Sequence, residues 1–240
     1  RLRHYWQSAL SSPLAVVVAA MNPASDYCPP PPDPDWILAV DSTFILLNKP
    51  AGLLSVPGRG ADKQDCAASR IQAQFPDALI VHRLDMATSG LLLLARGPAM
   101  QSRLSQLFRE RQVDKRYRAV VAGHLAQDEG EIDLPLITDW PNRPLQKVDF
   151  VAGKPSLTRF RREAYNAASD SSRVLLEPVT GRSHQLRLHL AALGHPILGD
   201  ELYAGIHRSR APRLLLHACS LSFPHPLTGH RCQHSSAAPF

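Results

Sequence analysis

Residues 81–95 read VHRLDMATSGLLLLA, a short polar segment that runs directly into an apolar one. The apolar run Leu91–Ala95 is too short to cross a membrane and has the length of a buried strand. Thr88–Gly90 favours a sharp turn, because hydroxyl groups bond nearby backbone and glycine tolerates positive φ. Asp85 is therefore expected at the edge of a rigid core element. A carboxylate at that place could be catalytic, or it could merely cap a turn.

The composition is that of a globular protein with a moderate excess of positive charge. Of 240 residues, 44% are hydrophobic and 20% charged, and 27 basic against 21 acidic residues give a net charge of +6. Such an excess fits a protein that binds a polyanion, although many basic enzymes bind no nucleic acid. The four cysteines are widely spaced and include no CxxC pair. We therefore expect no disulfide framework, no structural zinc site and a cytoplasmic location.

The first 35 residues are expected to lie outside the catalytic domain. Residues 1–20 combine a basic patch with a short apolar run, which only faintly resembles a signal peptide, so we interpret them as an upstream extension before a natural start at Met21. Residues 22–35 contain six prolines, which predicts a stiff and disordered leader. The catalytic domain is predicted to span residues 36–240, with no repeat, coiled coil or transmembrane span.

Apolar patterns predict more strands than helices. Helices are expected over 64–75, 98–111 and 184–193, the last with Ser183 as its N-cap and Gly194 as its stop. Strands are expected over 37–40, 44–47, 91–95, 119–123, 157–164, 173–179 and 214–218, and a proline-rich surface insertion over 133–158. Because the strands do not alternate regularly with helices, the fold class is α+β with a mixed, mainly antiparallel sheet.

Basic side chains gather in a few segments. Lys115 and Arg116 stand between an arginine-bearing helix and a strand, which is also typical of a solvated face. Arg143 and Lys147 lie in the proline-rich insertion near a tryptophan, a combination that suits RNA. Arg182 just precedes a predicted helix N-terminus, where it could meet a carboxylate or a phosphate.

Six motifs then occur in a fixed order, and together they resemble the RluA family of RNA pseudouridine synthases over about residues 36–228. The motifs are Asn48–Gly52, His82–Asp85 with Thr88–Gly90, Lys115–Tyr117, Gly181–Arg187, Gly194–Asp200 and Leu214–Ala218. Each motif alone is weak. Within the family, the segments Asp133–Ile137 and Trp140–Pro144 are most similar to the member that gives the family its name, a dual-specificity enzyme for 23S rRNA and tRNA.

The resemblance implies the pseudouridine synthase fold, with an active-site cleft across the sheet, and isomerisation of uridine to pseudouridine in structured RNA. The implied targets are a 23S rRNA loop and a tRNA anticodon stem-loop. RNA is the implied partner of a monomeric enzyme that needs no membrane, metal or organic cofactor.

The resemblance also implies roles for single residues. Asp85 matches the essential aspartate, which either attacks the sugar or base or removes the C2′ proton. Arg182 matches the arginine that pairs with this carboxylate, and Tyr117 matches the tyrosine that stacks on the target base. Arg83 matches the residue that fills the place of the flipped base, since a guanidinium stacks on bases and bonds phosphate. Further RNA contacts are expected from Lys115, Arg116, Arg143, Lys147 and His82, the last of which also fits a structural role.

The C-terminal segment departs from the family's pattern. A phenylalanine or similar residue is expected near His234, which leaves the packing of the last strand open. His225, His230 and Cys232 lie close to His234 in the sequence, and we interpret this group as incidental rather than as a metal site.

Two other functions compete with the enzyme. An RNA-binding or ribosome-assembly factor could keep the fold without the chemistry, but binding alone needs no acid at position 85. A basic hydrolase that uses Asp85 lacks a partnered nucleophile or metal site.

Overall fold

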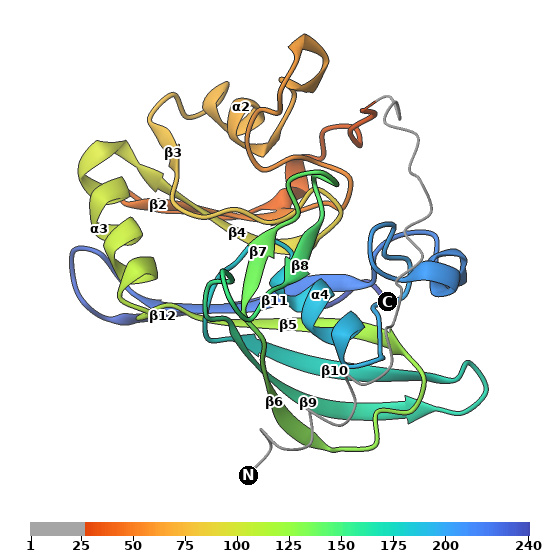
Figure 1. Ribbon diagram of the computed structural model, residues 1–240. Coiled ribbons are helices and arrows are strands. Elements are labelled where there is room, and N and C mark those ends of the chain that lie inside the picture. Colours follow the sequence, from red (N-terminus) through yellow and green to blue (C-terminus); the bar gives the residue numbers. More distant parts are fainter. Residues whose placement is uncertain (1–26) are drawn as a thin grey trace.

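A ten-stranded mixed sheet runs through residues 27–240, the part of the chain that the computed structural model describes (Figure 1). Its main path follows the order β1-β2-β4-β11-β5-β10-β9-β6, while β3 pairs with β4 and β12 with β11. Neighbouring strands are antiparallel throughout except for β4 and β11. The strands are β1 (Ile37–Val40), β2 (Phe44–Lys49), β3 (Ala78–Ile80), β4 (Ser89–Arg96), β5 (Asp114–Ala122), β6 (Glu129–Asp133), β9 (Leu157–Asn166), β10 (Ser171–Pro178), β11 (Leu216–Pro224) and β12 (Arg231–Ser235). The predicted α+β class is confirmed.

Few helices accompany the sheet. The α-helices are α2 (Ala67–Gln72), α3 (Gly97–Arg109) and α4 (Gln185–Ala192), and the 3₁₀ helices are η1 (Pro34–Trp36), η2 (Ala61–Lys63) and η3 (Gly205–Arg210). A separate hairpin of β7 (Leu136–Thr138) and β8 (Gln146–Val148) stands beside α4 (Figure 1). This hairpin is the predicted proline-rich insertion.

Strand β4 is buried on both faces because each face packs into a different apolar cluster. Leu92 and Leu94 pack in a cluster with Ile71 of α2, whereas Leu91 and Leu93 pack in another with Leu104 of α3. All four β4 leucines are at most 1% exposed. Burying one leucine stabilises the fold by about 1.5–3 kcal/mol, so the apolar run anchors this end of the sheet.

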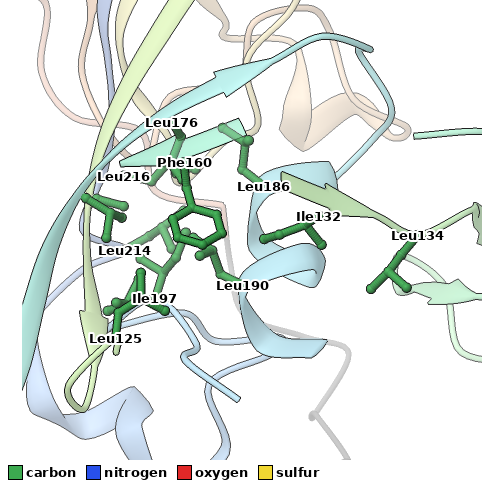
Figure 2. Packing of buried hydrophobic residues seen from close by; sticks show 13 residues of the cluster. Leu125, Ile132, Leu134, Phe160, Leu176, Leu186, Leu190, Ile197, Leu214 and Leu216 are labelled. Atoms are coloured by element: carbon green, nitrogen blue, oxygen red, sulfur yellow. The ribbon is translucent and has the colours of Figure 1, made fainter. Parts of the chain in front are cut away.

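A third apolar cluster lies between α4 and the strands β5, β9 and β10. Figure 2 shows Leu186 and Leu190 of α4 directed at Phe160 and Leu176 of the sheet. These two leucines form the apolar stripe through which the helix packs on the sheet. The packing fixes α4 across the sheet and thereby places the segment before it, residues 180–184.

Several element boundaries differ from the prediction. Strand β5 begins at Asp114, so Tyr117 lies inside the strand rather than before it. Helix α4 has His184, not Ser183, at its N-cap. The preceding turn is organised instead by the buried amide of Gln185, whose oxygen accepts bonds from the Arg182 N–H at 3.0 Å and the Thr180 hydroxyl at 2.7 Å. The predicted stop at Gly194 is confirmed by its left-handed φ of +86°.

The part of the predicted leader that the structure describes, residues 27–35, contacts the domain. The Tyr27 hydroxyl donates to the Asp65 carbonyl at 2.8 Å and accepts from the Leu54 N–H at 3.0 Å, and Arg70 donates to the Pro30 carbonyl at 2.8 Å. Residues 27–35 therefore pack on the domain. The predicted extension over 1–20 lies outside the described residues, and within residues 27–240 no helix is long and apolar enough to cross a membrane.

The divergent C-terminal segment forms β12, an edge strand paired with β11. The ring of His234 packs against both Phe44 and Phe223, with centroid distances of 5.9 and 6.0 Å, and these two phenylalanines also contact each other at 5.3 Å. Its Nε2 atom is buried and has no hydrogen-bond partner within residues 27–240. A histidine thus occupies an aromatic slot where the resemblance led us to expect phenylalanine.

Candidate active site

A cavity of about 1440 Å³ opens where the loop before β4 meets β5, β12 and the start of α4. Its walls include most of the predicted site residues. Asp85, Tyr117 and Arg182 line it, and so do His82, Arg83, Lys115 and Arg116. Residues from distant parts of the sequence are therefore brought to one place, as the motifs predict.

The loop that carries Asp85 is fixed on both sides of this residue. Ser55 Oγ donates to the Leu84 carbonyl at 2.8 Å and accepts the Leu84 N–H at 3.1 Å. On the other side, the Met86 carbonyl accepts from the Gly52 N–H at 2.8 Å and from Lys49 Nζ at 3.2 Å. These bonds hold the backbone while the Asp85 side chain remains 25% exposed, toward the cavity. A preorganised carboxylate of this kind suits catalysis.

Lys49 is a buried cation beneath this loop. Besides Met86, its Nζ donates to the carbonyls of Leu53 and Pro50, at 2.7 and 2.8 Å. Burial lowers the pKa of Lys49 to about 7, while the charge of Asp85 acts to raise it. An ammonium group has three donors for these three carbonyls, so Lys49 ties the turn after β2 to the loop of Asp85.

Gly90 lets β4 approach β11 closely, directly after the Asp85 loop. Its φ is +110°, and a Cβ at this position would lie 2.3 Å from the Ala218 carbonyl oxygen. Only glycine fits both the backbone angle and the space. The next residue back, Ser89, bonds His217 Nδ1 at 2.9 Å and accepts from Arg213 at 2.8 Å. The end of the loop is therefore bound to β11.

Arg187 forms the ion pair with Asp85. Its Nη1 lies 3.3 Å from Asp85 Oδ2, and its Nε and Nη2 donate to the two oxygens of Asp200, each at 2.7 Å. Burial alone would lower the pKa of Arg187, but the hydrogen bonds of Asp200 and the charges of Asp200 and Asp85 raise it. Arg187 thus stays charged beside Asp85, held by a bidentate partner that is fully buried.

The predicted pairing of Asp85 with Arg182 is wrong. The Arg182 guanidinium is exposed and donates to the Pro155 carbonyl at 3.4 Å from both Nε and Nη2. The reason is its place before the N-cap of α4, at the rim of the cavity. Arg187 lies inside the helix next to the leucine stripe and therefore reaches the cavity floor.

Tyr117 lies on β5 and packs against two of the three apolar clusters, the one that contains Leu186 and the one that contains Leu92. Its ring borders the cavity. Burial raises the pKa of Tyr117, and the nearby charge of Asp85 raises it further. The phenol is therefore protonated and uncharged.

His82 and Arg83 differ in their surroundings although they are adjacent. His82 Nε2 accepts the Leu93 N–H at 2.9 Å, and its ring stacks on Phe108 with a centroid distance of 4.5 Å. Burial lowers the pKa of His82 to about 3, so the ring is neutral and fastens the loop to β4. Arg83 is exposed, and its guanidinium has no hydrogen bond or ion pair to any residue of the described chain.

The other predicted RNA contacts divide into two groups. Lys115 and Arg116 line the cavity; Arg116 pairs with Glu177 at 2.8 Å, whereas Lys115 forms no ion pair within residues 27–240. Arg143 and Lys147 are exposed on the β7–β8 hairpin and do not line the cavity. Arg143 stacks over Trp140 with its Cζ 4.7 Å from the ring centroid.

Arg187, Asp200 and Lys49 were missed as site residues, although each lies in one of the quoted motifs. One signal was available, since Arg187 adjoins the apolar stripe of its helix and a buried arginine needs a carboxylate partner. Nothing local identifies Asp200 as that partner. No group of three or more potential metal ligands occurs within residues 27–240.

Comparison of the sequence with known proteins identifies its family. Residues 43–192 match the family described as RNA pseudouridylate synthase. The dual-specificity RNA pseudouridine synthase RluA of Escherichia coli K12 is 51% identical over 213 residues, which cover 88% of this chain and 97% of that protein. RluA of Vibrio parahaemolyticus is 54% identical over 203 residues, or 82% of this chain and 81% of the relative.

Solved structures agree as well. The human RNA pseudouridylate synthase domain containing 1 superposes with a TM-score of 0.71 at 29% identity, covering 92% of this chain and 87% of that one. The predicted resemblance is thereby confirmed. The chain belongs to the RNA pseudouridylate synthase family, with the fold of that family, and it is an enzyme that isomerises uridine to pseudouridine in RNA.

Proposed function

We propose that Asp85 is the catalytic residue of this isomerisation, within a catalytic domain that spans residues 36–240. The observation that carries the proposal is the position of its carboxylate, which faces the cavity and is paired with the buried Arg187. A nearby cation favours the ionised form of a carboxylate. Attack on the sugar or base requires that ionised form, and so does removal of the C2′ proton.

Tyr117 supports the reaction as the surface on which the target base stacks. Its protonated phenol carries no charge that would repel Asp85. Because the phenol is protonated, it can donate a hydrogen bond to the uracil but cannot accept the proton that C5 loses.

Arg83 fills the place that the target base leaves when it flips out of its stack. The exposed guanidinium, two residues before Asp85, has no partner in residues 27–240 that it would have to release. Flipping costs a few kcal/mol, and stacking of a planar cation in the vacated place offsets part of that cost.

The RNA backbone follows the basic rim of the cavity. Lys115, Arg116 and Arg182 contact phosphates near the flipped base, because they line the cavity and carry positive charge. Arg143 and Lys147 contact the RNA farther out, from the β7–β8 hairpin. His82 lines the same cavity and acts by holding the loop of Asp85.

A 23S rRNA loop and a tRNA anticodon stem-loop are the proposed substrates. Support comes from the identity of about half the residues to proteins named dual-specificity RNA pseudouridine synthase. The enzyme acts as a monomer, in the cytoplasm where both RNA classes are found. Incubation with each transcript, followed by mapping of pseudouridine, tests the proposal; modification of one class alone would contradict dual specificity.

Substitution Asp85→Asn tests the catalytic assignment. The variant should bind RNA with an affinity near that of the wild type and form no pseudouridine. Asp114→Asn is the matched control, since Asp114 is another aspartate that lines the cavity, and its side chain pairs with Arg231 rather than with Arg187. If Asp85→Asn retains activity, or if both variants lose it, the assignment of Asp85 is wrong.

A further inference from the structure

His184 lies beside Asp85, and the proposed mechanism assigns it no role. Its Nε2 is 4.0 Å from Asp85 Oδ1, on the carboxylate oxygen that Arg187 does not contact. The side chain is 13% exposed and lines the cavity. Catalytic hydrogen bonds are often long in the free enzyme and shorten when the substrate binds. A shift of about 1 Å would bring this pair into hydrogen-bond range.

The backbone of His184 is strained. Its φ of +54° and ψ of +17° place a residue with a side chain in the left-handed region, at the N-cap of α4, with no capping hydrogen bond. Strain of this kind persists where surrounding contacts hold it, and it concentrates at functional sites. The contacts in this case are those of the imidazole ring.

Tyr203 fixes the proton position on that ring. Its Oη accepts the Gln146 backbone N–H at 2.9 Å and lies 2.8 Å from His184 Nδ1. The hydroxyl hydrogen has no other acceptor within residues 27–240, so Tyr203 donates it to Nδ1. A neutral imidazole that accepts at Nδ1 carries its hydrogen on Nε2. That N–H faces Asp85.

We propose that His184, oriented by Tyr203, is a positioning residue that presents its Nε2–H to Asp85 Oδ1. Arg187 binds Oδ2 at the same time, so the two donors fix the plane of the carboxylate relative to the flipped uridine. Fixed geometry lowers the barrier because the reacting groups need no further alignment. The inference rests on the proposed role of Asp85.

The electrostatic surroundings agree with this arrangement. Burial lowers the pKa of His184, against the opposing effect of the Asp85 charge, which keeps the ring neutral near pH 7. Arg187, Asp200 and Arg83 are the other charged groups that act on it. Burial raises the pKa of Tyr203 to about 12, so its hydroxyl keeps the proton that it donates.

Two substitutions at position 184 separate the two ring nitrogens. His184→Asn retains a residue type that tolerates left-handed φ and can replace Nδ1 toward Tyr203, but it is too short to reach Asp85. His184→Gln extends an amide N–H to the position of Nε2. Single-turnover rates at saturating RNA and RNA dissociation constants are measured for both. We expect His184→Asn to slow the reaction about 10- to 100-fold with RNA affinity within about threefold of the wild type.

Recovery by glutamine is the decisive result. His184→Gln should react at least about tenfold faster than His184→Asn. Tyr203→Phe, which removes the donor to Nδ1, should slow the reaction about tenfold. His189→Gln is the control, because this buried histidine of the same helix bonds Thr158 and the Leu134 carbonyl, away from Asp85. It should lower the melting temperature without slowing the single-turnover reaction.

The inference alone is overturned if Asp85→Asn is inactive and His184→Asn reacts at the wild-type rate, or if His184→Asn and His184→Gln react at equal rates. An active Asp85→Asn variant overturns the proposed function and this inference with it. A slow His189→Gln would also overturn the inference, since loss of activity would then follow from loss of helix stability.

Discussion

Arg187 bridges Asp85 and Asp200, contacting the first with one guanidinium nitrogen at 3.3 Å and the second with two at 2.7 Å. The shorter, bidentate contact is the fully buried one. Asp200 therefore fixes the guanidinium, and the remaining nitrogen is directed at the carboxylate that faces the cavity. The arrangement explains how the guanidinium of Arg187 keeps a fixed position beside Asp85 although Asp85 is partly exposed.

Arg187→Lys tests the contacts of Arg187 with Asp85 and Asp200, the first through the reaction rate and the second through stability. Lysine keeps the charge but cannot serve both carboxylates with a planar fork, so the rate at saturating RNA should fall about 100-fold or more. Stability should fall by about 2–4 kcal/mol, since the buried Asp200 loses a hydrogen bond. Arg182→Lys is the comparison: it should weaken RNA binding at most and leave the single-turnover rate within about threefold. Single-turnover kinetics and urea denaturation measure both effects, and equal rate losses in the two variants would contradict the ion pair that the structure shows.

Gly90→Ala should destabilise the protein strongly. The added Cβ would meet the Ala218 carbonyl at 2.3 Å in a backbone conformation that alanine rarely adopts. A loss of about 3 kcal/mol or more is expected, or failure to fold. Gly97→Ala is a matched control, because this glycine also has a positive φ, +75°, but nothing lies within 4 Å of its added Cβ. It should cost about 1 kcal/mol. Equal losses of unfolding free energy in the two variants, measured by urea denaturation, would show that the close approach of β4 to β11 does not cause the destabilisation.

His234→Phe should stabilise the protein by about 1 kcal/mol. The imidazole Nε2 is buried beside Phe44 and Phe223 with no hydrogen-bond partner within residues 27–240, and an unsatisfied buried polar atom is costly. A phenyl ring fills the same slot without that cost. Thermal unfolding measures the gain, with His234→Ala as the variant that should lose stability through the cavity it leaves. A lower melting temperature for the phenylalanine variant would mean that the slot cannot hold the larger ring.

Acid should destabilise the fold through three histidines. Burial lowers the pKa of His82 to about 3 and those of His189 and His217 to about 4, whereas an unfolded histidine has a pKa near 6.5. Between these values the unfolded chain binds more protons than the native one, so the stability present above pH 6.5 is lost as pH falls toward 4. The slope is about 1.4 kcal/mol per pH unit for each histidine. Urea denaturation at several pH values measures it, and His189→Gln should remove about a third of this contribution. An unchanged slope would show that His189 is not neutral in the native state.

The elements that follow from the sequence are those with strong local patterns. The leucine run of β4, the amphipathic helix α3 and the hairpin of β1 and β2 are each determined by periodicity and turn residues within about fifteen positions. The His184 N-cap was not predicted, because Ser183 is the better local cap and the turn is set by Gln185, whose amide bonds Thr158 on β9. Tertiary contacts override the local preference there.

The site shows the same division. The order of the motifs predicts that Asp85, Tyr117 and the Gly181–Arg187 segment belong to one site. The structure places all of them at one cavity. That segment contains two arginines, Arg182 and Arg187. Which of them meets Asp85 depends on where the helix begins, and the prediction chose the wrong one. Asp200 could not be found from its own surroundings, since its role exists only through Arg187.

The parallel contact between β4 and β11 involves two residue pairs, Ser89 with His217 and Gly90 with Ala218. Asp85 lies in the half of the chain that is synthesised first, and Arg187 in the half that follows. Strand β11, near the C-terminus, inserts between β4 and β5 in the middle of the sheet. A growing chain therefore holds its reactive carboxylate long before it has the cation or the strand that supports the loop. The active site is therefore complete only after β11 has been made, and loss of β11 would remove the site although Asp85, Tyr117 and Arg187 remained.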